Sequence, residues 1–130
     1  MAAVKGKNTS PEKFVRSRIF AEGFRYRLYA KKLPGSPDLV LPRYYVAVFV
    51  HGCFWHGHDC PRGRRPRSNQ EFWNNKIDRN IERDRESIAA LKNAGWSVHV
   101  LWTCEIENGL EKLLQELNEK RRNLKSSAPN

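Results

Sequence analysis

The chain has 130 residues, a formal net charge of +10 at neutral pH and 39% hydrophobic residues. This length is typical of one domain, and the apolar content is enough for a core, which excludes a wholly disordered chain. No apolar run approaches the roughly 18 residues of a membrane-spanning helix, and the first ten residues lack the apolar stretch of a signal peptide. The excess of positive charge favours a polyanionic partner, with nucleic acid as the first candidate.

The first predicted element is a helix from residue 10 to about residue 22. Ser10 can cap its start, Pro11 suits its first turn, and Gly23 is typical of a helix end. Apolar and polar residues then alternate over residues 24–32, which predicts a strand, and a turn at 33–37 leads to a short strand at 38–41. Residues 44–50 read YYVAVFV, and this apolar run predicts a strand buried on both faces.

The second half of the chain predicts two helices separated by a strand. Ser68 and Glu71 form a capping-box pattern at the start of a long helix that extends to about residue 94. Its expected buried stripe comprises Phe72, Ile77, Ile81, Ile88 and Leu91. A strand follows at residues 97–104, and Asn108 could cap a last helix. Because the long helix connects two apolar strands, these strands are expected to be parallel neighbours in an α/β fold with a mixed sheet.

Histidine and cysteine residues gather in the segment HGCFWHGHDC, residues 51–60, and the third cysteine, Cys104, ends the last predicted strand. An odd number of cysteines argues against a disulfide framework. Parallel strands would bring Cys104 to the same sheet edge as this segment, and zinc prefers four tetrahedral nitrogen and sulfur ligands. The pattern therefore predicts a structural zinc site made by Cys53, Cys60, Cys104 and one histidine. The spacing leaves open whether that histidine is His58, His56 or His51.

Histidines that do not bind zinc are available for acid–base chemistry beside this segment. Asp38 lies at the mouth of a strand, where a carboxylate can hold Mg²⁺, and Glu12 could join it from the first helix. Both have simpler alternatives, since Asp38 could cap a turn and Glu12 could interact with the helix dipole. Together with the positive charge, these groups suit metal-assisted phosphodiester hydrolysis.

Several residues are candidates for contacts with DNA. Phe54 and Trp55 lie between candidate metal ligands, where both can hardly be buried, and rigid aromatic rings can wedge between base steps. A polar N-terminal segment contributes Met1, Lys5 and Lys7. The following segment PRGRRPR is expected to contact phosphates through Arg62, Arg64, Arg65 and Arg67.

Four segments together resemble the very short patch repair (Vsr) endonucleases, over about residues 1–106. They read KGKNTSPE, GFRYRLYAKKLPGSPDLVLP, VFVHGCFWHGHDCP and FWNNKIDRNIERDRESIAALKNAGWSVHVLWTC. The resemblance implies a divergent PD-(D/E)xK fold, restriction-endonuclease-like, with one nuclease domain over residues 1–125 and a polar tail at 126–130. It also implies a bacterial, cytoplasmic, monomeric enzyme that nicks double-stranded DNA 5′ to the T of a T:G mismatch. A mismatch-repair matchmaker protein is the further partner that it suggests.

The resemblance also implies roles for individual residues. Asp38 matches the catalytic aspartate that binds Mg²⁺, and the main-chain carbonyl of Val50 matches a second magnesium ligand. The usual fold signature carries a lysine after this strand, which this chain lacks, and His56 matches the general base that the family uses, assisted by His51 and Glu12.

For the zinc site, the resemblance implies the ligand set Cys53, His58, Cys60 and Cys104. Met1, Phe54 and Trp55 match residues that wedge into the duplex, and Trp73 lies in the matching DNA-facing region. Two alternatives are a restriction-type or damage-directed endonuclease of the same fold, and a zinc-stabilised DNA-binding module without catalysis. The retained set of acidic residues and histidines argues against the second alternative.

Overall fold

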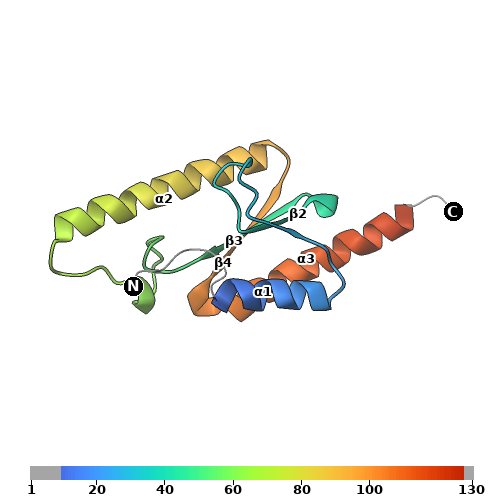
Figure 1. The fold of residues 1–130 in the computed structure, drawn as a ribbon, viewed down its shortest axis with the longest axis horizontal. Coiled ribbons are helices and arrows are strands. Elements are labelled where there is room, and N and C mark those ends of the chain that lie inside the picture. The colour runs from blue at the N-terminus through green and yellow to red at the C-terminus, as the bar shows by residue number, and fades with distance from the viewer. Residues whose placement is uncertain (1–9, 128–130) are drawn as a thin grey trace.

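The computed structural model describes residues 10–127 and their side chains as far as residue 124. Over this range one mixed sheet is flanked by three α-helices (Figure 1). The helices are α1 (Ser10–Ala21), α2 (Gln70–Asn93) and α3 (Ile106–Ser127), and the strands are β1 (Arg27–Leu28), β2 (Leu39–Leu41), β3 (Val46–His51) and β4 (Ser97–Trp102). None of the described helices is long and apolar enough to cross a membrane.

The strands are ordered β1-β2-β3-β4, and β2 pairs antiparallel with both β1 and β3. Strand β4 pairs with β3 in parallel, and this pairing sets His51 opposite Trp102. The predicted crossover is confirmed, because α2 connects two parallel neighbours. The parallel pairing carries the ends of β3 and β4, and the segments that follow them, to one edge of the sheet.

Strand residues alternate between two apolar layers, as the two-residue period of a strand requires. Helices α1 and α3 cover one face and α2 covers the other (Figure 1). Val46 and Val48 of β3 pack in the larger layer with α1 and α3, whereas Ala47 and Phe49 face α2 with Leu91. Strand β3 is therefore buried on both faces, as its continuous apolar run predicts.

The prediction of a long strand over residues 24–32 is wrong. Only Arg27 and Leu28 are extended and paired, because Tyr29 adopts a φ of 52° and ends the strand. The last strand also ends earlier than expected, at Trp102, and Cys104 lies in a 3₁₀ turn formed by Thr103–Glu105. Alternation of apolar residues indicates the direction of a strand but not where the backbone leaves the sheet.

The predicted helix starts need correction too. Helix α2 begins after Asn69, which has a φ of 54° and forms no side-chain capping bond, so the capping box of Ser68 and Glu71 does not form. Helix α3 begins at Ile106, directly after the 3₁₀ turn, and Asn108 lies inside it rather than at its cap. Phe72 does not join the buried stripe of α2, since 58% of it is exposed.

Candidate active site and metal centre

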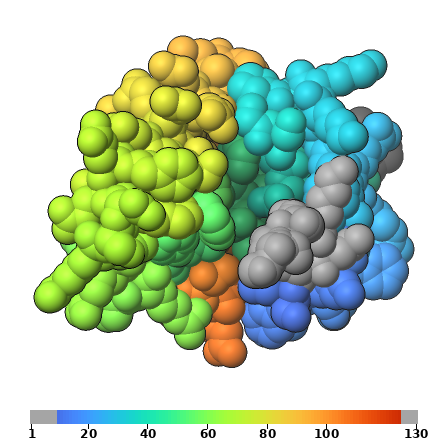
Figure 2. Space-filling view, turned by 60° about the vertical axis from the view of Figure 1, so that its left-hand side comes forward, coloured from blue at the N-terminus to red at the C-terminus, as the bar shows by residue number. Residues whose placement is uncertain are grey.

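The candidate catalytic side chains gather at one end of the sheet. Asp38 directly precedes β2, and His51 ends the antiparallel neighbour β3, so the two residues reach the same edge. Figure 2 shows the surface hollowed between α2, in yellow, and the cyan segment that joins β1 to β2. Helix α1 lies along the lower side of this hollow. Elements from both sides of the sheet thus contribute to one cleft.

Two carboxylates approach each other from different layers. The backbone N–H of Val50 donates to Asp38 Oδ2 at 2.6 Å. Glu12, from α1, is only 5% exposed, and its Oε1 accepts a hydrogen bond from the Tyr29 hydroxyl at 3.2 Å. Burial and the negative charge of Glu12 together raise the pKa of Asp38 to about 6. The hydrogen bond from the Val50 N–H partly offsets this rise. This pair of one buried and one half-buried carboxylate is a favourable environment for a hard divalent cation.

His51 and His56 form a stacked pair beside these carboxylates. Their ring centroids are 3.7 Å apart and their planes differ by 1°. His56 Nδ1 lies 2.6 Å from Asp84 Oδ2 of α2, whereas His51 is only 4% exposed and its Nδ1 has no partner among the described residues. Burial lowers the pKa of His51 to about 4, and the neighbouring His56 lowers it further. His51 is therefore uncharged at neutral pH.

Asp84 is the functional candidate that sequence reasoning missed. The buried stripe of α2 has a gap between Ile81 and Ile88, and position 84 falls in this gap at helical spacing. An acidic residue on the apolar face of a helix is unusual, because a buried carboxylate needs a partner. The gap in the stripe is the signal that could have identified Asp84.

The atoms of His51, His56 and Asp84 lie within 4.8 Å of one another, which is close enough for a metal cluster. The ring geometry argues against one shared ion, because imidazole lone pairs lie in the ring plane and two parallel stacked rings confine them to separate parallel planes, so they do not converge on one point. The carboxylate of Asp84 also already bonds His56 Nδ1. The arrangement suits a hydrogen-bonded acid–base pair.

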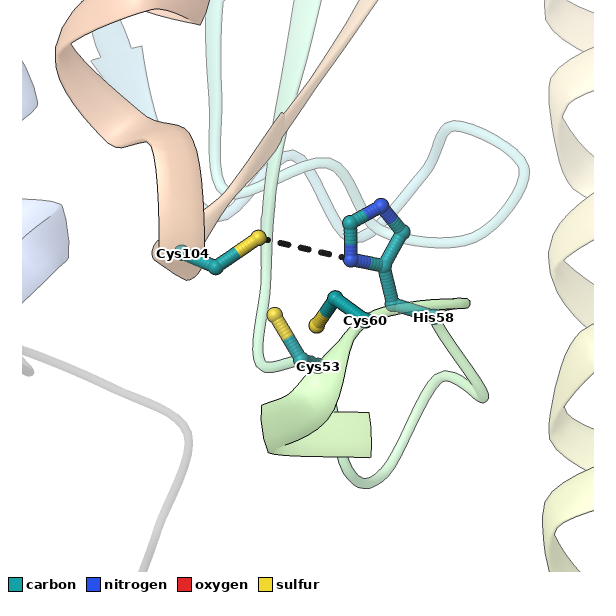
Figure 3. A group of neighbouring side chains, drawn as sticks. All are labelled: Cys53, His58, Cys60 and Cys104. Carbon is teal, nitrogen blue, oxygen red and sulfur yellow. Dashed lines mark hydrogen bonds between the residues drawn. The ribbon is translucent and has the colours of Figure 1, made fainter. Parts of the chain in front are cut away.

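A second cluster contains the predicted zinc ligands. Sulfur and nitrogen atoms of Cys53, His58, Cys60 and Cys104 lie within 4.8 Å of one another (Figure 3). Cys104 Sγ is 3.5 Å from His58 Nδ1. In a tetrahedral zinc site with bonds of about 2.0–2.3 Å, ligand atoms are roughly 3.5 Å apart. The geometry selects His58 from the three histidines that the spacing left open, and the cluster could bind zinc.

The surroundings of this cluster fit a cation. Burial and the neighbouring sulfurs Cys53 and Cys60 raise the pKa of Cys104. Burial opposes ionisation of Cys53 as well, yet hydrogen bonds with Thr103 and Cys104 lower its pKa below the ordinary value. Crowded thiols that cannot all ionise alone become stable thiolates when a metal neutralises them. His58 Nε2 also lies 4.0 Å from a carboxylate oxygen of Glu105, which places a negative charge near this ring.

Gly63 follows the loop of residues 53–60, which we call the metal loop, and packs closely against it. A Cβ atom at this position would lie 2.0 Å from the main-chain oxygen of His58. We expect Gly63→Ala to lower the free energy of unfolding by about 1–3 kcal/mol through overpacking. Gly52→Ala is the control, because its Cβ would meet only Trp55 Cδ1 at 4.0 Å. Urea denaturation measures both, and equal stabilities of the two variants would contradict this packing.

The candidate wedge residues form an aromatic cluster, which we define as Phe54, Trp55, Phe72 and Trp73. Ring centroids of Phe54 and Trp73 are 5.4 Å apart, and those of Trp55 and Trp73 are 5.9 Å apart. Trp55 is 41% exposed, and Phe72 extends the cluster outward from Trp73 at 5.1 Å. Asn80 donates to the Trp55 carbonyl oxygen, so α2 also holds the loop that carries these rings.

The four arginines of residues 62–67 differ in their environments. Arg65 bonds Asn74 and Asp78 of α2 at 2.9 Å each, which fixes the segment to the helix. Arg62, Arg64 and Arg67 are all exposed, and Arg62 also donates a hydrogen bond to the Thr103 carbonyl oxygen at 3.4 Å. Arg64 and Arg67 are thus the better placed for phosphates. Met1, Lys5 and Lys7 lie outside the described residues.

Comparison with known proteins shows the family of the chain. A family model described as DNA mismatch endonuclease Vsr matches residues 1–62. The type II nicking enzyme V.XorIIP of Xanthomonas oryzae pv. oryzae is 49% identical over 108 residues, which cover 83% of this chain and 79% of the relative. The DNA mismatch endonuclease Vsr of Escherichia coli is 40% identical over 116 residues, which cover 89% of this chain and 74% of the relative. The chain belongs to the Vsr family.

A third relative, the type II nicking enzyme V.NmeAIP of Neisseria meningitidis, is 42% identical over 125 residues, 92% of this chain and 89% of its own length. Membership of the Vsr family makes the chain a DNA endonuclease, and hence a phosphodiester hydrolase. It also excludes the alternative of a zinc-stabilised DNA-binding module without catalysis.

Proposed function

We propose that this chain nicks one strand of duplex DNA 5′ to the T of a T:G mismatch. The observation that carries the proposal is the arrangement of the cleft: the buried carboxylates, the stacked histidines and the aromatic cluster all lie around the end of β3. A hydrolytic centre and rings able to enter a base stack would then contact the same stretch of DNA.

Asp38 and the main-chain carbonyl of Val50 would hold Mg²⁺. Their closeness supports this assignment, since the Val50 N–H already binds Asp38 Oδ2 at 2.6 Å. When bound, Mg²⁺ supplies charge that stabilises the phosphorane-like transition state and the leaving oxygen. Glu12 adds a second carboxylate that can accept hydrogen bonds from bound water.

His56 acts as the general base in this proposal. If Nδ1–H donates to Asp84, the Nε2 lone pair is free to take a proton from the attacking water. Asp84 then stabilises the imidazolium that forms, and the uncharged His51 ring supports His56 by stacking. A carboxylate and a histidine pair take the place of the usual lysine.

Replacement of Asp84 by Asn tests the general base. We expect Asp84→Asn to lower the single-turnover nicking rate by roughly 10²- to 10⁴-fold, because the amide can favour the wrong histidine tautomer. Affinity for DNA should be unchanged. Glu86→Gln is the matched control, since Glu86 is an exposed carboxylate on the same helix. A rate for Asp84→Asn equal to that of the control would exclude Asp84 from the mechanism.

The DNA contacts follow from the same cleft. Phe54 and Trp55 would wedge beside the mismatch, with Trp73 behind them and Met1 contributing from the N-terminal segment. Arg64 and Arg67 would bind phosphates, and Lys5 and Lys7 would add charge. We further propose that the enzyme works as a monomer in the bacterial cytoplasm, with a mismatch-repair matchmaker as partner.

Two duplexes that differ at one base pair, T:G or T:A, test the substrate. With Mg²⁺ present, the proposal predicts nicking of the T:G duplex and little cutting of the T:A duplex. Equal cutting of both would overturn it and favour a restriction-type or damage-directed endonuclease of the same fold. A competition assay adds a test of binding. Unlabelled T:G duplex should displace a labelled T:G duplex from the protein better than unlabelled T:A duplex does.

A further inference from the structure

We propose that Trp102 is a positioning residue that couples the Cys53–His58–Cys60–Cys104 cluster to the His51–His56 pair. Its indole contacts both groups: the centroids of the His58 and Trp102 rings are 4.1 Å apart with planes 12° apart, and the His51 ring lies 5.2 Å away in a T-shaped arrangement with planes 71° apart. The inference rests on the proposed role of His56 as general base.

The backbone explains why Trp102 reaches both groups. It is the last residue of β4 and pairs in register with His51, the last residue of β3. Two residues later the chain places Cys104 in the metal cluster. Trp102 therefore lies at the end of the sheet, half-buried on its strand, beside the strand from which the metal loop continues.

The ring contacts leave His51 little freedom. Phe49 contacts it at 5.4 Å, Trp102 at 5.2 Å and His56 at 3.7 Å, all between ring centroids. Asp84 holds His56 at Nδ1, and the His51 ring stacks on one face of the His56 ring. A smaller side chain at position 102 would open space beside His51, and the stacked pair could shift away from Asp84.

The backbone of the metal loop also connects the metal cluster to His56. His56 lies between Cys53 and His58 in the sequence, so the position of the loop determines where the backbone of His56 lies. The Trp102 indole stacks on the His58 ring, at 4.1 Å between ring centroids. It thus contacts the metal loop two residues after His56. The indole therefore contacts both His58 of the metal cluster and His51, the ring that stacks on His56.

The test compares Trp102→Leu, Trp102→Phe and Trp96→Leu in the zinc-loaded protein. Trp96 is the matched control, because it is a half-buried indole just before the start of β4 that packs on Tyr45, far along the strand from Trp102. We expect Trp102→Leu to lower the single-turnover nicking rate by about 10- to 100-fold, the size of effect seen for small misplacements of reacting groups. The affinity for DNA should change by less than about twofold, and Trp102→Phe should restore most of the rate, because a ring still supports His51.

A second readout does not depend on cleavage. Transfer of zinc to a chromophoric chelator should be faster for Trp102→Leu than for Trp102→Phe or Trp96→Leu, since the stack on His58 is lost. A wild-type protein that does not nick DNA would defeat the proposed function, while the zinc-transfer rates would still test the contact with His58. Identical transfer rates for all the variants would overturn the coupling.

A double-mutant cycle with Asp84→Asn separates positioning from a general loss of structure. If Trp102 acts through His56, Trp102→Leu should reduce the rate much less in the Asp84→Asn background than in the wild type. Full additivity of the two losses would overturn the inference. If Trp102→Leu does not fold, Trp102→Met, which keeps more apolar volume but no ring, provides the same cycle.

Discussion

Replacement of Asp38 by asparagine is expected to abolish nicking without loss of the fold. A carboxylate that positions a catalytic cation contributes several kcal/mol to the transition state, which corresponds to a rate loss of about 10³-fold or more. The side-chain amide can keep the hydrogen bond from Val50 N–H, so the end of β2 should retain its place beside β3. Single-turnover cleavage of a T:G duplex measures the effect.

Three further measurements make this result specific. Affinity for DNA should stay the same or increase, because the variant removes a negative charge from the cleft. The melting temperature in metal-free buffer should not fall, because burial raises the pKa of Asp38 to about 6 and the ionised carboxylate is thus costly to the fold at neutral pH. Glu111→Gln, an exposed position on α3, is the charge-matched control. Residual nicking by Asp38→Asn at the rate of the control would refute the assignment of the site.

Loss of zinc is the second large effect that we expect. Cys104→Ser should bind less than one zinc per chain and should melt at least roughly 10 °C lower, because a structural zinc site contributes several kcal/mol and such a loss shifts the melting temperature of a domain by this amount. The loop of residues 53–60 has little regular structure of its own, so the cluster and α2 together hold it in place.

His99→Gln is the control for the zinc prediction. His99 lies in β4 but outside the cluster, and its Nε2 contacts Glu116 at 2.8 Å. This variant should keep one zinc per chain and change the melting temperature little by comparison. Elemental analysis and scanning calorimetry provide the two readouts. A zinc-free wild-type protein with the melting temperature of the zinc-loaded form would contradict a structural role for the ion.

The sequence predicts the central strands well, because their pattern is dominated by burial. The apolar run at 44–50 identifies β3 as a strand covered on both faces, and the crossover rule then assigns its parallel neighbour. The structure confirms both assignments, apart from a shift of the strand to Val46–His51. Tyr45 explains the later start, since its φ of 55° turns the chain just before the strand.

Element ends are predicted less well, because they depend on contacts between distant parts of the chain. The capping-box motif at Ser68 is locally favourable, yet the arginine segment before α2 is held by Arg65 on Asn74 and Asp78. The chain therefore enters α2 through the left-handed conformation of Asn69, and no side chain caps the helix. Local capping preferences contribute only about 1 kcal/mol, which such tertiary contacts can exceed.

Local sequence predicts only part of the candidate site, because the rest depends on contacts between residues that are distant in the chain. The segment at 51–60 predicts a metal cluster from local spacing, and the cluster in the structure contains His58, the histidine that the family resemblance implies. The stacking of His51 on His56 and the contact of His56 with Asp84 involve separations of up to 28 residues, which spacing alone does not reveal. Only the gap in the apolar stripe of α2 hints at Asp84.

The most direct test of the proposed activity is a strand-resolved cleavage assay with the wild-type protein, Mg²⁺ and a T:G duplex labelled separately on each strand. We expect a single cut, in the T-containing strand, at the phosphodiester 5′ to the mispaired T, with the G-containing strand intact. Cuts in both strands, or a cut whose position does not move when the mismatch is moved along the duplex, would contradict it.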